Sequence, residues 1–119
     1  MMGFKGKQFI KVAEEIEKNY KGEPYLRTAV GRYYYACFLT GRSYYEHKTH
    51  KRLGKKDAHE RLINYFQGSR NPIEKKLGNK LKNMRNYRNN ADYAHIFKKE
   101  NIKRIKKESR QFFKYIRKL

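Results

Sequence analysis

The sequence has few residues that form disulfides, break helices or carry negative charge. It contains one cysteine, no tryptophan, two prolines and 11 acidic residues among 119. A single cysteine excludes an intrachain disulfide framework and is typical of a reducing compartment, so we expect a cytoplasmic protein. The longest uncharged run, 33–41, is far shorter than the ~20 residues that span a bilayer. The N-terminal residues also lack the apolar stretch of a secretory signal.

Positive charge dominates the composition. There are 31 Lys and Arg residues against 11 Asp and Glu, which gives a formal net charge of +20. Such an imbalance favours a polyanionic or acidic partner over a neutral metabolite. Nucleic acid is such a partner, but the charge alone does not distinguish RNA from DNA or from another acidic partner. The candidate nucleic-acid-binding residues are Arg85, Lys51, Arg52, Lys55 and Lys56.

Apolar residues recur every three or four positions, which predicts helices throughout. The expected helices cover residues 9–20, 24–44, 57–67, 72–91 and 101–119. The basic segment 46–56 lacks this periodicity and is interpreted as a surface loop. Helices joined by short links predict one all-α domain over residues 1–119, an up-and-down bundle of four to five helices.

Local signals mark two helix starts and two unusual glycines. The stretch 71–74, Asn-Pro-Ile-Glu, predicts an N-cap residue followed by proline at the first helical position. Asp57 with Glu60 resembles a capping box for the short helix expected over residues 57–67. Gly31 and Gly41 lie inside the second helix, where each costs ~1 kcal/mol relative to alanine. Close approach of neighbouring helices is the expected compensation.

Two polar residues continue the apolar stripe of the fourth helix. The stripe consists of Leu77, Leu81, Met84 and Ala91, and Arg88 and His95 fall at the same spacing. Both side chains point the same way if the helix continues to residue 95. Because burying an unpaired guanidinium costs several kcal/mol, either the helix ends before residue 95 or this face meets a cleft or a second subunit. Alternatively the stripe rotates, with Tyr87 and Ala94 pointing inward and Arg88 solvated.

An arginine and a histidine suit cleavage of RNA without a metal. A base takes the proton of the ribose 2′-OH while a fixed cation stabilises charge on the phosphate. Arg88 and His95 are ~10 Å apart along a straight helix, so two protomers related by a twofold axis could align them better than one. Asn89 could orient the phosphate. Asp92 either supports the reaction or forms an i,i+4 ion pair with Arg88.

Residues 88–95, Arg-Asn-Asn-Ala-Asp-Tyr-Ala-His, resemble the signature of the HEPN superfamily. That signature is an arginine, a polar residue, a spacer of four to six residues in all, and a histidine. Residues 91–93 also resemble the Arg-x-x-Ala-Asp-Tyr form of small prokaryotic members. Upstream, residues 27–38 are similar to the Arg-x-Tyr-Tyr-Ala-x-Phe helix of those members.

The resemblance implies a dimeric helical bundle with metal-independent, cofactor-free endoribonuclease activity, commonly as a toxin or in defence. Under it, Arg88 and His95 are the catalytic pair at the dimer interface and Asn89 is the supporting polar residue. Such proteins are often encoded beside a minimal nucleotidyltransferase antitoxin. Some are silenced when that partner attaches a nucleotide to a tyrosine near the motif, and Tyr93 is the candidate.

Two non-enzymatic functions fit the same residues: a nucleic-acid-binding helical module, and a subunit that binds an acidic partner such as a nucleotidyltransferase. His47, His50 and His59 lie in or next to the basic loop. His47 and His50 have the spacing of zinc ligands but lack a second close pair, so we expect no metal site. We expect Cys37 to behave as a small hydrophobic side chain. We expect the three consecutive tyrosines at 33–35 to pack in the core.

Overall fold

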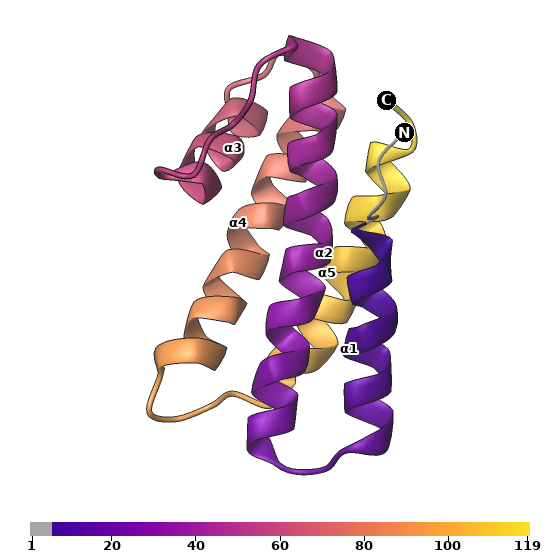
Figure 1. Ribbon diagram of the computed structural model, residues 1–119, viewed down its shortest axis with the longest axis vertical. Helices are drawn as coiled ribbons and strands as arrows, with labels where there is room; N and C mark the ends of the chain where they lie inside the picture. Colours follow the sequence, from indigo (N-terminus) through magenta and orange to yellow (C-terminus); the bar gives the residue numbers. More distant parts are fainter. Residues whose placement is uncertain (1–5) are drawn as a thin grey trace.

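The structure, a computed structural model, describes residues 6–119, which fold into helices and links without a strand (Figure 1). The five helices are α1 (Lys7–Asn19), α2 (Glu23–Thr49), α3 (Ala58–Gln67), α4 (Pro72–Tyr93) and α5 (Glu100–Ile116). The predicted all-α bundle is therefore confirmed. Residues 1–5, on which the expectation about a secretory signal partly rests, lie outside the described residues. Across residues 6–119, no helix combines the length and apolar character required to cross a membrane.

The long helix α2 lies at the centre of the bundle. Its 27 residues extend ~40 Å, which matches the 41 Å longest dimension of the molecule. It packs against α1, α4 and α5, while α3 lies mainly against α4 (Figure 1). The buried residues of α2 are Ala29, Val30, Tyr33, Tyr34, Ala36, Cys37, Phe38 and Gly41. Tyr35 is partly buried against this core, so the tyrosine run serves packing as predicted. Burial raises the pKa of the Cys37 thiol, which behaves as a small hydrophobe.

The two glycines of α2 have different surroundings. A Cβ atom at Gly41 would lie 3.3 Å from Phe66 and 3.4 Å from Leu62 and Phe112, so side chains of α3 and α5 pack directly on this position. The expected close approach is confirmed there. At Gly31 the expectation is wrong, because a Cβ atom would meet nothing within 4 Å.

The predicted loop 46–56 is wrong at its beginning, because α2 continues to Thr49. Tyr44 and Lys48 lie one turn apart on α2 and both donate to the carboxylate of Glu74, with Lys48 Nζ 2.7 Å from Oε2. Glu74 is only 2% exposed. The last turn of α2 therefore has polar partners in α4, which apolar periodicity cannot indicate. His50 then ends the helix in the left-handed region, with φ of 58°.

The predicted N-cap of α4 is confirmed, whereas the predicted capping box of α3 is wrong. Asn71 Oδ1 accepts from the backbone N–H groups of Ile73 at 2.8 Å and Glu74 at 3.3 Å. Asp57 precedes α3 with φ of 52° and makes no side-chain capping bond.

The pKa of the Glu74 carboxyl group is lowered. Burial alone would raise it, but hydrogen bonds from Lys48, Ser69 and Tyr44 outweigh the effect of burial.

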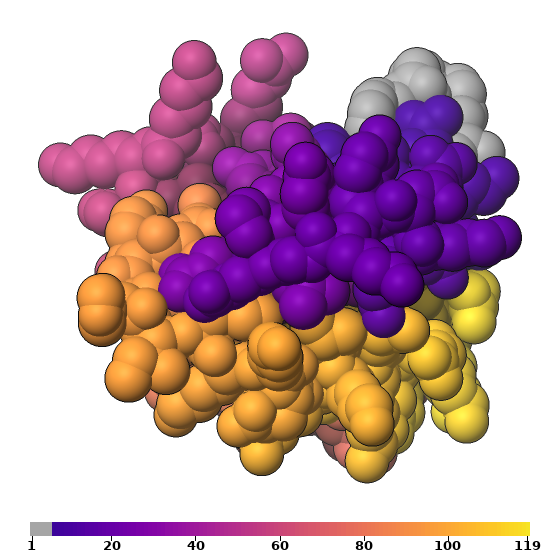
Figure 2. Space-filling view, turned by 90° about the horizontal axis from the view of Figure 1, so that it is seen from below, coloured from indigo at the N-terminus to yellow at the C-terminus, as the bar shows by residue number. Residues whose placement is uncertain are grey.

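The link 94–99 between α4 and α5 is fastened to the beginning of α2 by Arg27. One guanidinium nitrogen donates to the carbonyls of Ala91 and Ala94, each at 2.9 Å, and the other donates to the carbonyl of His95 at 3.4 Å. The ring of Phe97, buried to 8% exposure, lies 5.3 Å from the guanidinium carbon. Figure 2 shows this end of the molecule, with the orange α4–α5 region against the purple α2.

Alanine substitutions at Gly31 of α2 and at Gly78 of α4 should have opposite effects on stability. Gly31→Ala removes backbone freedom from the unfolded chain without a clash, so we expect the free energy of unfolding to rise by ~0.5–1 kcal/mol. A Cβ atom at Gly78 of α4 would lie 2.8 Å from the backbone nitrogen of Gln67, so Gly78→Ala should lower the free energy of unfolding by ~1–3 kcal/mol. Urea unfolding followed by circular dichroism measures both, and destabilisation by Gly31→Ala would contradict the packing described.

Replacing Arg27 by methionine should loosen the link 94–99. Three backbone carbonyls lose their donor, so we expect a loss of ~1–3 kcal/mol in unfolding free energy and faster amide hydrogen exchange in this link. Arg110→Met removes the same charge from an exposed position of α5 and is the matched control. Exchange rates that are equal in the two variants would show that Arg27 does not hold the link.

Candidate functional site

Arg88 lies on α4 where this helix packs against α2. Its side chain is 22% exposed, and its guanidinium carbon is 6.0 Å from the ring centroid of Tyr34 and 5.9 Å from that of Tyr35. Nε forms an ion pair with Oδ2 of Asp92 at 2.9 Å. Asp92 is thus the i,i+4 partner of Arg88, one of the two roles considered for it. The arginine is neither fully solvated nor buried without a partner.

His95 lies two residues beyond the end of α4. Ala94 has an extended backbone, with φ of −74° and ψ of 139°, so the helix does not continue to residue 95 and His95 leaves the stripe. Its carbonyl accepts from Arg27, but its imidazole is exposed and forms no hydrogen bond or ion pair with residues 6–119. The neighbouring side chains of Tyr93 and Ile96 are 77% and 75% exposed. This end of the bundle therefore presents an imidazole between two uncovered apolar side chains.

Arg85 lies one turn before Arg88 and lacks a partner. Its Nε is buried and has no hydrogen-bond partner, and Arg85 forms no ion pair within the described range. Asn89, the predicted supporting residue, is exposed on the adjacent position of α4. The structure therefore places Arg85, Arg88, Asn89 and Asp92 on successive turns of one helix. It separates the imidazole of His95 from them by the change in backbone direction at Ala94.

His59 of α3 lies against the same part of α2 and was missed as a functional residue. Its Nδ1 is 2.7 Å from the hydroxyl oxygen of Tyr34, and its ring stacks on Phe38 with 4.0 Å between centroids. Burial and the positive charges of Arg85, Arg88 and Arg42 lower the pKa of His59 to about 4, so this imidazole is neutral at pH 7.

A signal for the position of His59 was present in the sequence. Residues 59, 62, 63 and 66 follow the spacing of one helix face, and the last three are Leu62, Ile63 and Phe66. All three are buried, and His59 is partly buried beside them. Placing His59 with the basic loop overlooked this periodicity.

The basic loop residues lie apart from the link that carries His95. Lys51, Arg52, Lys55 and Lys56 are exposed in the α2–α3 connection. This connection begins at the opposite end of the bundle from the α4–α5 link (Figure 1). Leu53, only 1% exposed, anchors it, since its N–H donates to Glu46 and its carbonyl accepts from Arg61. The loop cations and His95 thus lie toward different ends of the molecule.

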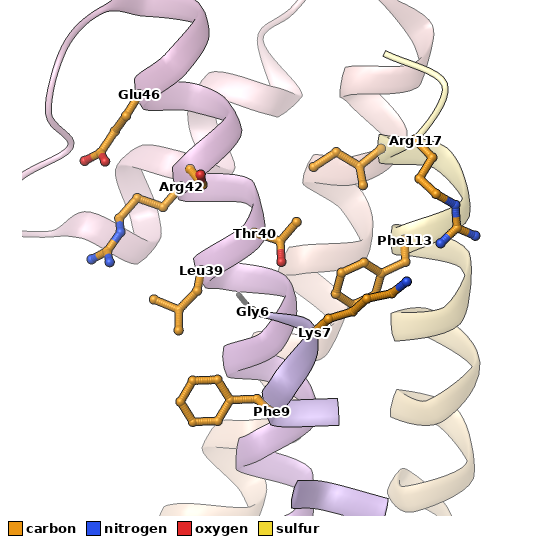
Figure 3. Close-up of a pocket in the computed structure, with 11 residues that line it drawn as sticks. Gly6, Lys7, Phe9, Leu39, Thr40, Arg42, Glu46, Phe113 and Arg117 are labelled. Carbon is orange, nitrogen blue, oxygen red and sulfur yellow. The ribbon is translucent and has the colours of Figure 1, made fainter. Parts of the chain in front are cut away.

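A groove of about 790 Å³ runs between the beginning of α1, the middle of α2 and the end of α5. Figure 3 shows the ring of Phe113 directed from α5 toward Lys7 at the beginning of α1. None of the predicted site residues lines this groove. Over residues 6–119, no three His, Cys, Asp or Glu side chains are grouped closely enough to hold a metal ion.

No protein-family model matches the chain, and neither a curated protein nor a solved structure matches it. The resemblance to the HEPN superfamily therefore rests on the residues of the two motifs. In the structure residues 27–38 lie on α2 and residues 88–93 of the second motif lie on α4, whereas His95 lies beyond the end of α4. The two helices pack against each other through Tyr34, Tyr35 and Arg88.

Proposed function

We propose that the chain is a metal-independent endoribonuclease that acts as a homodimer. Arg88 is the phosphate clamp, His95 the general acid or base, and Asn89 a supporting polar residue. The observation that carries this proposal is the imidazole of His95, which is exposed and has no polar partner among residues 6–119, on a backbone that Arg27 holds in place. An imidazole presented in this way is available to a ligand or to a second subunit.

The proposed dimer is supported by the apolar surface around His95. Tyr93 and Ile96, on either side of it, expose three quarters of their surface. Burying such side chains against a second copy is favourable, and a twofold axis there would bring both α4 ends together. The two copies then offer two imidazoles and two guanidinium groups to one RNA strand.

The proposed reaction needs only proton transfer and charge stabilisation. His95 takes the proton of the ribose 2′-OH, the 2′-oxygen attacks phosphorus, and the bond from phosphorus to the 5′-oxygen breaks. The leaving oxygen receives a proton from the second His95, which starts in the imidazolium form, and a 2′,3′-cyclic phosphate remains. Arg88 stabilises the charge that develops on the phosphate oxygens, since a guanidinium matches their geometry. Asp92 fixes the orientation of Arg88.

A non-catalytic RNA-binding module is the second candidate function. The ion pair with Asp92 offsets part of the charge of Arg88, and the exposed cations are distributed over the α2–α3 loop and α5. Such a module binds RNA with an affinity that falls steeply with salt, without cleavage, and loses affinity in small steps as lysines are removed. An acidic nucleotidyltransferase partner would modify Tyr93 in the single protomer, where this side chain is exposed, and would thereby oppose the proposed dimer contact.

Cleavage of RNA in the presence of EDTA tests the enzymatic proposal. We expect His95→Ala and Arg88→Ala each to lower the cleavage rate of tRNA or mRNA by ~100-fold or more, because each removes a group used in the transition state. Arg110→Met, with the same loss of one charge as Arg88→Ala, should cut at nearly the wild-type rate. Equal cutting by all variants would remove both residues from the mechanism, and no cutting by the wild type would favour the binding module.

A further inference from the structure

Four side chains from three helices, His59 and three arginines, form a cationic cluster beside Tyr34 and Phe38. Arg42 comes from α2, His59 from α3, and Arg85 and Arg88 from α4. All three arginines act electrostatically on His59, and Arg85 and Arg88 also act on Tyr34. Within residues 6–119, these four side chains make one ion pair, Arg88–Asp92. With His59 neutral, three positive charges face one negative charge, and the cluster has a net charge of +2.

Aromatic rings help to position two of these guanidinium groups. Arg88 lies over Tyr34 and Tyr35 and also pairs with Asp92 through Nε, and the guanidinium carbon of Arg42 lies 6.0 Å from the ring of Phe38. Figure 3 shows Arg42 directed away from Phe113, although it also borders the groove. A guanidinium packed on a ring face keeps its N–H donors available at its edge, so Arg42 and the N–H groups of Arg88 that Asp92 does not use can bind an anion.

Arg85 gives an independent indication of a missing acceptor. Its Nε is buried without a hydrogen-bond partner, and leaving a buried charged donor unpaired costs free energy. His59 offers a further donor: when the hydroxyl of Tyr34 donates to Nδ1, the ring proton of the neutral imidazole is on Nε2. The ligand that matches guanidinium donors and a net positive site is an oxyanion with several oxygens.

We infer that Arg42, His59 and Arg85 form, next to Arg88, a binding site for a backbone phosphate of RNA that is distinct from the scissile phosphate assigned to the proposed catalytic pair. The choice of RNA as the source of the phosphate rests on the proposed function. The anion site itself rests on the uncompensated charge and on the unpaired donor of Arg85. The strand then runs from this site past Arg88 toward His95.

Titration of the His59 ring provides a direct readout that does not depend on catalysis. In the free protein the imidazole titrates with a pKa of about 4, because burial and the charges of Arg85, Arg88 and Arg42 disfavour the imidazolium form. The hydroxyl of Tyr34 faces it from α2 and stays protonated, since burial raises its pKa. A bound phosphate brings negative charge beside the ring and favours the imidazolium, so binding should raise the pKa of His59.

The experiment is an NMR titration of the His59 ring signals against pH, with and without a ligand. The probes are inorganic phosphate and a 2′-O-methyl oligoribonucleotide, which cannot be cleaved through the 2′-oxygen. We expect the oligoribonucleotide to raise the pKa of His59 by at least one pH unit. We also expect Arg85→Met to weaken its binding at least tenfold, whereas Arg110→Met, which removes the same charge elsewhere, changes binding no more than about twofold.

Two results would overturn the inference: no change in the pKa of His59 with the oligoribonucleotide, or equal weakening of binding by Arg85→Met and Arg110→Met. If inorganic phosphate changes the pKa of His59 and the oligoribonucleotide does not, the site takes a small anion and not RNA. Cleavage by the wild type with no change at His59 would overturn the inference and leave the nuclease proposal in place. A pKa rise with no cleavage would support the phosphate site and reject the nuclease proposal.

Discussion

The contact between Arg88 of α4 and the aromatic side of α2 is the interaction on which the functional account depends. Tyr34 and Tyr35 shield the guanidinium, and among residues 6–119 its one ion-pair partner is Asp92. Because Arg85 lies one turn away with an unpaired Nε, the helix pair concentrates positive charge at a surface where water is partly excluded. Charges in such surroundings interact more strongly with an anion than do lysines in open solvent.

Two further features determine where the histidine side chains His59 and His95 lie relative to this contact. The first residues of α3 bring His59 against Tyr34 and Phe38, and burial together with three arginines keeps its imidazole neutral at pH 7. Beyond the C-terminal end of α4, the backbone turns at Ala94 and Arg27 holds the link that carries His95. The two histidines therefore differ in character. His59, on α3, is enclosed by aromatic rings, and His95, just beyond the end of α4, is open to solvent.

Sequence periodicity predicted the helices well because each one has an apolar face that packs against α2 or α4. Leu77, Leu81, Met84 and Ala91 are buried as the stripe predicted. The last turn of α2 was missed because Tyr44 and Lys48 are held there by the buried carboxylate of Glu74, a contact between distant segments that spacing along one helix does not show. The position of His95 off the stripe likewise depends on Arg27, 68 residues earlier in the chain.

The most direct test of the account is the location of RNA on the protein. A structure of the protein with an uncleavable 2′-O-methyl oligoribonucleotide should show phosphate oxygens within hydrogen-bond distance of Arg88 and the strand lying along α4 toward His95. Finding the strand only on the lysines of the α2–α3 loop and α5, with Arg88 and His95 free of it, would contradict the central claim.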